Sequence, residues 1–157
     1  MKPKTLLLAK ITTGCLFGLF WYIGVSAYIK PKAVNTYSIS VTIKNIRNKS
    51  GRIQLHIYKT QKGYSERKGW KSVLLYKNKM QGSTLKYTFK GIPGGVYGLA
   101  LLDDENNNTK MDYGWLLPKE GFGFADYYHT KWSTPHFNDF KFHLNADRSV
   151  MMKVRYM

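Results

Sequence analysis

Apolar and polar residues alternate with a period of two over much of the chain, which is typical of β-strands that bury one face. In the first such run, Ile39, Val41 and Ile43 share one face, with polar residues between them. Six further alternating or short apolar runs follow, so the pattern predicts seven strands. They include residues 39–43, 53–57, 73–76, 85–89, 96–102, 140–144 and 150–156.

The spacing of these runs predicts how the strands connect. The turn-rich Asn48-Lys49-Ser50-Gly51 separates the first two runs, which predicts a hairpin between them. Residues 96–102 are apolar on both faces, as in a central strand. Beyond the N-terminal segment there is no convincing amphipathic helix, so a second sheet must cover the buried faces, and we expect an all-β sandwich. The expected core contains Ile39, Val41, Ile53, Leu55, Leu85, Phe89, Leu99 and Phe142.

Residues 1–27 have the features of an export signal. Three lysines accompany a largely apolar stretch from Ile11 to Val25, and Val25-Ser26-Ala27 offers the small residues that a signal peptidase needs. An uncleaved anchor is the alternative, because residues 11–29 approach the ~20 needed to span a bilayer. Lipidation of Cys15 is a third interpretation. All three predict that residues 28–157 form a single domain that is periplasmic or extracellular.

The charge is strongly positive and unevenly distributed. The 157 residues carry 25 Lys and Arg against 9 Asp and Glu, a net charge of +16. Residues 28–99 account for 15 of the basic residues and contain one acidic residue, Glu66. These lysines are either solvated outward positions of strands and loops, or a surface for an anionic envelope component or an acidic polysaccharide. An exported protein is not expected to meet nucleic acid.

Residues 103–138 are too long for an ordinary connection, and such loops are usually functional or ordered by something bound. With Asp104 as position 1, oxygen-bearing side chains fall at positions 1, 3, 5 and 9, and a main-chain carbonyl is available at position 7. Hard cations such as calcium take 6 to 8 oxygen ligands, so the spacing predicts a calcium site. Asx-turns are the alternative. The candidate ligands are Asp104, Asn106, Asn108, Lys110 and Asp112, with Glu120 or Asp126 to complete the set.

Three motifs in the same order resemble a known family. They are Gly91-Ile92-Pro93-Gly94-Gly95-Val96-Tyr97, the acidic and Asn-rich run from Asp104 to Asp112, and Pro118-Lys119-Glu120-Gly121-Phe122-Gly123-Phe124-Ala125. The family consists of small exported bacterial β-sandwich proteins recorded only as a domain of unknown function. Thr109 and Ala125 stand where the family tends to have Gly and Ser. The resemblance implies an immunoglobulin-like or transthyretin-like sandwich outside the cytoplasm, and no established activity.

Aromatic residues concentrate in the same long segment. We expect Phe122 and Phe124 to be buried, whereas Trp and Tyr combine an apolar ring with a polar group that suits a binding surface. The candidate ligand-binding residues are Tyr113, Trp115, Tyr127, Tyr128 and Trp132.

Two classes of function remain open from the sequence. The first is a noncatalytic module whose calcium-ordered loop presents the aromatic surface. The second is a carbohydrate-active or other hydrolytic enzyme that uses Asp112 and Glu120 as paired carboxylates. No nucleophile elbow, phosphate-binding glycine loop or dinucleotide fingerprint occurs in the chain. We therefore expect the first class.

Overall fold

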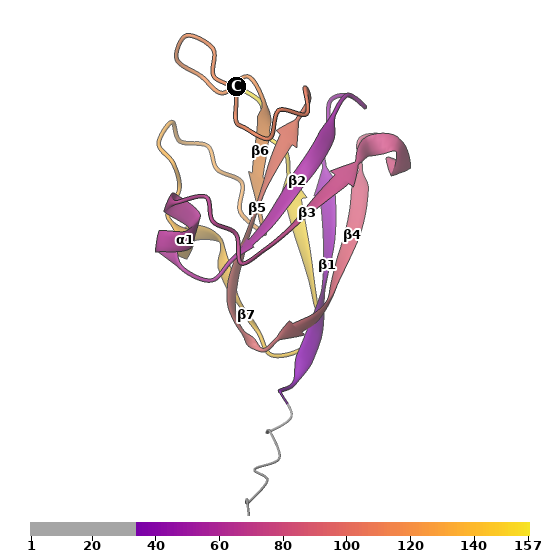
Figure 1. The fold of residues 1–157 in the computed structure, drawn as a ribbon, viewed down its shortest axis with the longest axis vertical. Helices are drawn as coiled ribbons and strands as arrows, with labels where there is room; N and C mark the ends of the chain where they lie inside the picture. The colour runs from indigo at the N-terminus through magenta and orange to yellow at the C-terminus, as the bar shows by residue number, and fades with distance from the viewer. Residues whose placement is uncertain (1–33) are drawn as a thin grey trace, which may run out of the picture. The chain divides into compact units, whose positions relative to one another are not determined.

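The computed structural model describes residues 34–157, and within them two β-sheets pack face to face (Figure 1). The first sheet has the strand order β4-β1-β8 and the second β3-β2-β5-β6, with β7 also paired to β5. The strands are β1 (Thr36–Lys44), β2 (Arg52–Tyr58), β3 (Lys71–Tyr76), β4 (Leu85–Pro93), β5 (Gly95–Asp104), β6 (Gly121–Phe124), β7 (Lys141–Leu144) and β8 (Arg148–Lys153). The predicted all-β sandwich is confirmed.

The strand count differs from the sequence prediction. The described residues form eight strands where the pattern predicted seven, and the extra one is β6. Its residues lie within the segment that we expected to be a single long loop. The motif Gly121-Phe122-Gly123-Phe124 is too short and too rich in glycine to stand out by alternation, and it becomes a strand by pairing with residues 100–103 of β5.

The predicted hairpin between the first two strands is wrong. β1 pairs antiparallel with β4 and parallel with β8, whereas β2 pairs with β3 and β5 in the other sheet. The turn-rich residues 45–51 carry the chain between sheets, with left-handed backbone at Asn45 and Gly51. Alternation shows that each strand buries one face, but two strands that face each other across a core satisfy the same pattern.

The main core fills the space between the two sheets. Every one of the eight core residues expected from alternation is buried there. Ile46, Ile92, Tyr97, Leu144, Val150, Met152 and Val154 are among the residues that complete the cluster. Burial of alternate side chains from both sheets is the main stabilising contribution to such a sandwich.

A second apolar cluster covers the outer face of the five-stranded sheet, where α1 (Gln61–Ser65) and α2 (Phe137–Phe140) lie. Its buried members are Tyr58, Ala100, Phe124, Phe137 and Phe140. Because both faces of β5 are covered, residues 96–102 are apolar on both faces, and the prediction of a central strand is confirmed. Gly98 allows close approach, since a Cβ there would lie 2.7 Å from the rings of Phe137 and Phe140.

The remaining short element is the 3-10 turn η1 (Lys77–Lys79), which follows β3. No helix within residues 34–157 is both long enough and apolar enough to cross a membrane. The predicted export signal, the alternative anchor and Cys15 lie outside the described residues.

Candidate functional site

The acidic loop begins at Asp104, the last residue of β5, whose side chain is fully buried. Asp104 Oδ2 accepts hydrogen bonds from Arg52 Nε at 3.1 Å and from Gln54 Nε2 at 2.8 Å, both on the neighbouring β2. The register places Arg52 directly opposite Asp104, so the sheet itself brings this ion pair together. Asp104 therefore belongs to the sheet as much as to the loop.

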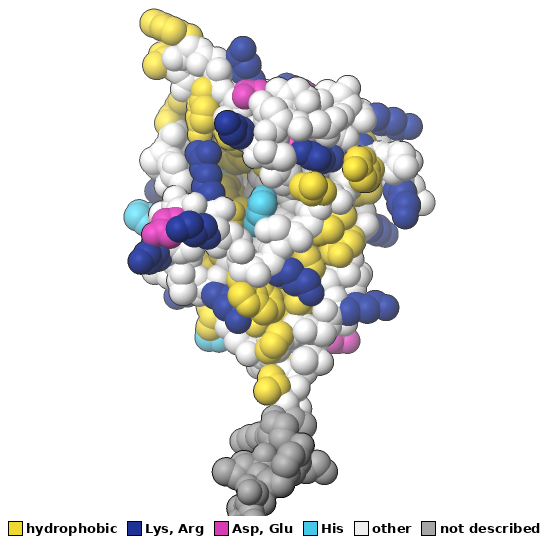
Figure 2. Space-filling view, viewed as in Figure 1, with side chains coloured by type: hydrophobic (Ala, Val, Ile, Leu, Met, Phe, Trp, Pro, Cys, Tyr) yellow, Lys and Arg dark blue, Asp and Glu magenta, His cyan; other side chains and the backbone are white. Residues whose placement is uncertain are grey.

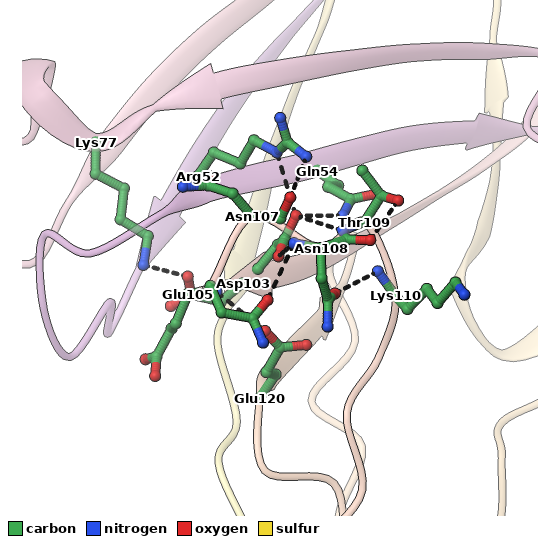
Figure 3. Close-up of polar contacts among 12 residues, drawn as sticks. Arg52, Gln54, Lys77, Asp103, Glu105, Asn107, Asn108, Thr109, Lys110 and Glu120 are labelled. Atoms are coloured by element: carbon green, nitrogen blue, oxygen red, sulfur yellow. Dashed lines mark hydrogen bonds and ion pairs between the residues drawn. The ribbon is translucent and has the colours of Figure 1, made fainter.

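The same carboxylate organises the turn that follows it (Figure 3). Its Oδ1 accepts from the main-chain N–H of Asn108 at 3.0 Å, and its Oδ2 accepts from the N–H of Thr109 at 3.1 Å. Four donors thus converge on one buried carboxylate, which is the arrangement that satisfies a desolvated negative charge.

The side chains of Asn106, Asn108 and Asp112 lie together on the far side of this turn. Asn106 Nδ2 donates to Asp112 Oδ2 at 2.5 Å, and Asn108 Nδ2 donates to both Asp112 oxygens at 2.9 and 3.0 Å. The two amide oxygens accept main-chain N–H groups two residues further on, which are Asx-turns. Three of the side chains predicted to bind calcium are therefore in direct contact.

Glu120 closes the loop from its other end. Its buried carboxylate accepts the N–H of Glu105 at Oε1 (3.0 Å) and the N–H of Asp112 at Oε2 (3.2 Å). Burial raises the pKa of Glu120, and the negative charges of Asp104 and Asp112 raise it further, against the two hydrogen bonds that lower it. Both Glu120 oxygens thus support the loop backbone, which is a positioning role.

Within residues 34–157, no group of three or more His, Cys, Asp or Glu side chains is arranged to hold a metal ion. The oxygens predicted as ligands accept N–H groups of the loop instead. Asp126, the other candidate for completing the set, is bound to β8, where it accepts from Met151 N at 2.8 Å and from Arg148 Nη2 at 3.1 Å. In this arrangement the Asx-turns hold the loop together with the carboxylates of Asp104 and Glu120.

Thr109 has a left-handed backbone conformation, with φ of 68°. A β-branched residue is strained there by about 1 to 2 kcal/mol. We expect Thr109→Gly to raise the free energy of unfolding by a few tenths of a kcal/mol up to about 1 kcal/mol, because glycine relieves the strain at some entropic cost. Urea denaturation checks this, with exposed Thr130→Gly as the control that brings no such gain.

The tip of the long segment is a small hairpin of residues 113–118. Tyr113 and Pro118 form an antiparallel bridge, and Gly114 N donates to Leu117 O at 2.7 Å. This closure leaves Trp115 and Leu116 at the turn, where they are 95% and 74% exposed. The loop thus holds two large apolar side chains out in solvent.

Trp132, 79% exposed, lies beside this hairpin, and both tryptophans line one surface hollow. We call this set the tryptophan surface; it consists of Trp115, Leu116, Leu117, Pro118, Lys119, Trp132 and Met157. Hydrophobic side chains project at the corresponding end of the molecule in Figure 2.

None of the three tyrosines predicted to bind a ligand belongs to the tryptophan surface. Tyr127 is half-buried and packs against Phe124 in the second core cluster. Tyr128 is exposed beside Lys153, whose Nζ lies 5.0 Å from the ring centroid. Tyr113 is exposed at the base of the hairpin, where its hydroxyl lies 3.5 Å from Arg67 Nη2. Phe124 is buried and Phe122 half-buried, close to the expectation.

Sequence reasoning missed a buried polar group formed by Lys77, Asp103 and Tyr156. Asp103 shares the core face of β5 with Leu99 and Leu101, and Lys77 Nζ lies against its Oδ1. The alternation of β5 does signal an inward-facing acid at 103. No sequence pattern indicates that Lys77 is buried, because an exposed lysine at the end of a strand has the same local sequence.

The comparisons with known proteins give a family and no activity. A family model described as an uncharacterised protein conserved in bacteria (DUF2141) matches residues 41–152, which cover most of the sandwich and the whole acidic loop. Searches of the curated proteins and of the solved structures found no match. The resemblance to a domain of unknown function is confirmed at the level of the family. The chain belongs to the DUF2141 family of uncharacterised bacterial proteins.

Proposed function

We propose that this protein is an exported, noncatalytic binding module that docks on anionic membranes through the tryptophan surface. The observation that carries the proposal is the pair of tryptophans with their neighbour Leu116, all more than 70% exposed around one surface hollow. Single exposed apolar residues are ordinary, but a contiguous group of the largest side chains marks an interaction site.

The chemistry of the surface favours lipid as the partner. Tryptophan is enriched at the boundary between headgroups and acyl chains, because its ring is apolar and its N–H is polar. Lys110, Lys119 and Lys131 belong to the segments around the two tryptophans and are exposed, so they can meet anionic headgroups. Lysine and arginine side chains are also spread widely over the face shown in Figure 2, where acidic groups are few. An acidic polysaccharide is the other partner that such a surface fits.

Calcium is the proposed cofactor of the loop that supports this surface. The contact of Asn106 and Asn108 with Asp112 supports it, because rotation of the two amides turns their oxygens toward the carboxylate side and creates a cluster of hard ligands. The ion would then replace the amide donors at Asp112. The hairpin of residues 113–118 begins directly after Asp112, and its base is tied to that residue by the Lys119 N–H, which donates to Asp112 O at 2.8 Å.

The hydrolytic alternative has less support from the geometry. Catalysis by paired carboxylates requires one protonated and one ionised group that face a substrate across an open cleft. Both oxygens of Glu120 bond main-chain N–H groups, and Asp112 is covered by two asparagine amides. These contacts support a role of Glu120 in loop structure and of Asp112 in the proposed calcium site, rather than in catalysis.

Vesicle sedimentation tests the membrane proposal. We expect the full chain to bind phosphatidylglycerol vesicles at low salt, to bind phosphatidylcholine vesicles weakly, and to lose affinity as salt screens the lysines. The double variant Trp115→Ala/Trp132→Ala should lose most of the binding. The matched control is Leu74→Ala, which removes an exposed apolar side chain from the edge strand β3.

Three outcomes contradict the proposal. Equal binding of the double variant and the wild type assigns adsorption to other parts of the chain. If binding survives molar salt and is equally strong on neutral vesicles, the lysines make no electrostatic contribution to membrane affinity. If the protein binds an acidic polysaccharide and does not bind vesicles, the polysaccharide is the partner of the tryptophan surface.

A further inference from the structure

Lys77 is the only lysine with a fully buried side chain among residues 34–157, and it faces a fully buried aspartate. Lys77 begins η1, directly after β3, and Asp103 lies on the core face of β5. The Lys77 ammonium contacts Asp103 (Figure 3), although β2 lies between β3 and β5 in the sheet. The two exposed fractions are 1% and 0%, so water has no access to the contact.

A third side chain completes the group from the opposite sheet. The hydroxyl of Tyr156, which follows β8, donates to Asp103 Oδ2 at 2.5 Å. The hydroxyl oxygen of Tyr156 in turn accepts the main-chain N–H of Arg47 at 3.0 Å, and the Arg47 guanidinium lies 4.4 Å from the centroid of the tyrosine ring. Burial raises the pKa of Tyr156, so its hydroxyl keeps its proton and remains a donor to Asp103.

If Lys77 and Asp103 are both charged, they have too few hydrogen-bond partners to compensate for their burial. An ammonium has three donors, yet Lys77 Nζ has no hydrogen-bond partner within the described residues beyond its contact with Asp103. Asp103 Oδ1 likewise has no further partner. Two charges taken out of water need many compensating hydrogen bonds.

We propose that Lys77 Nζ and the Asp103 carboxyl carbon condense into an intramolecular amide bond that links the end of β3 to β5. One proton passes from the ammonium to Oδ1, which leaves an amine beside a carboxylic acid. The nitrogen lone pair forms the new C–N bond, while Tyr156 O–H stabilises the negative charge that develops on Oδ2. The Oδ1 hydroxyl then takes the second proton from nitrogen and leaves as water. Ammonium plus carboxylate thus give amide plus one water, and no oxidant or other reactant is needed.

Three features of the site favour this condensation. The fold holds the amine against the acid in one geometry, which replaces the entropy that two separate reactants lose. The dry interior returns no water to hydrolyse the product. The product is a neutral amide, so the reaction removes two unsatisfied charges from the core. In a chain whose only cysteine is Cys15, such a bond serves as the covalent link that a disulfide supplies elsewhere.

The intact mass of the purified full chain, measured after denaturation, is the deciding experiment. We expect a mass lower than the sequence mass by one water molecule, with the N-terminus read from the same sample. Trypsin does not cut after an acylated lysine, so digestion should yield peptide 72–79 joined to peptide 91–110. A full sequence mass, or a separate peptide ending at Lys77, overturns the proposal.

Two variants test the roles of the partners. Lys77→Met has a side chain of similar length without the amine and should show the full sequence mass; a water deficit that persists in it overturns the proposal. Tyr156→Phe retains the lysine and the aspartate, so we expect a partly reacted population, which mass spectrometry resolves as two species. Complete reaction in Tyr156→Phe removes the tyrosine from the mechanism. The mass of the wild-type protein by itself decides whether the amide bond forms, so this test does not depend on how well either variant folds.

Discussion

Replacement of Gly51 by alanine should lower the free energy of unfolding by about 3 to 5 kcal/mol, one of the largest effects of any single substitution in this domain. A Cβ at Gly51 would lie 2.0 Å from the main-chain oxygen of Asp104 and 2.6 Å from the Cα of Glu105. These atoms belong to the backbone and cannot rotate away. The φ of +69° adds strain for any residue with a side chain.

The effect has a structural reason beyond the clash. Gly51 immediately precedes β2, and the chain crosses there from one sheet to the other against the first residues of the acidic loop. An added methyl group must separate β2 from the end of β5, where Arg52 binds Asp104. The substitution therefore weakens the sheet and the loop together.

Urea denaturation of the full chain measures this, and two other glycines provide matched controls. Gly82 and Gly91 have φ values of +59° and +67°, but a Cβ there meets nothing within 4 Å. Alanine at either position should cost only the conformational strain, about 1 kcal/mol. If Gly51→Ala is no less stable than these controls, the close packing of residues 51, 104 and 105 is not a feature of the folded protein.

Calcium should raise the stability of the wild-type protein by about 2.7 kcal/mol at a hundredfold excess over its dissociation constant. An ion that binds only the folded state stabilises it by mass action, and each kcal/mol shifts the melting temperature of such a domain by roughly 2 to 8 °C. Differential scanning calorimetry of chelator-treated protein, with and without millimolar calcium, measures the shift. Equal melting temperatures, with no heat of binding, would remove calcium from the proposed function.

The structure determines which variants suit this test. Asp104→Ala is unsuitable, because four donors bind this buried carboxylate and its removal leaves the Arg52 guanidinium without its ion-pair partner. Asp112→Ala removes the carboxylate that both asparagine amides face and should abolish the calcium response while the sandwich stays folded. Asp126→Ala is the control, because its carboxylate is bound to β8 and the response should persist.

The pH dependence of the response follows from Glu120. Its raised pKa means that the folded, metal-free protein takes up this proton more readily than the unfolded chain. The group therefore favours folding below its unfolded pKa, and this contribution is lost as the pH rises through the folded value. The negative charge of ionised Glu120 acts on the neighbouring Asp112 and favours a bound cation there, so the calcium-dependent shift should shrink as the pH falls, beginning above the ordinary range for glutamate. Glu105 acts in the opposite direction, because its hydrogen bond to Arg47 lowers its pKa.

The local sequence determines only part of the geometry of the candidate site. The odd-numbered spacing predicted that alternate side chains of a tight turn meet, and the side chains of Asn106, Asn108 and Asp112 do so. The same spacing describes Asx-turns equally well, and the orientation of each amide depends on contacts within the folded loop. Whether Trp115 and Trp132 lie together was not readable from the sequence, since that depends on how residues 113–118 bend back beside the C-terminus.

Alternation along the chain by itself determined the class of fold and the faces that are buried. Ile39, Leu55, Phe89 and Phe142 are core residues because a strand has only two faces and one of them must leave water. The tertiary structure decided which strands are neighbours, as the separation of β1 from β2 shows, because pairing depends on long-range geometry that period two does not contain. It also decided that Lys77 meets Asp103. The local sequence of Lys77 describes a surface lysine. The alternation of β5 turns Asp103 inward, but only the packing of β3, β2 and β5 with the Tyr156 segment encloses both side chains in a dry interior.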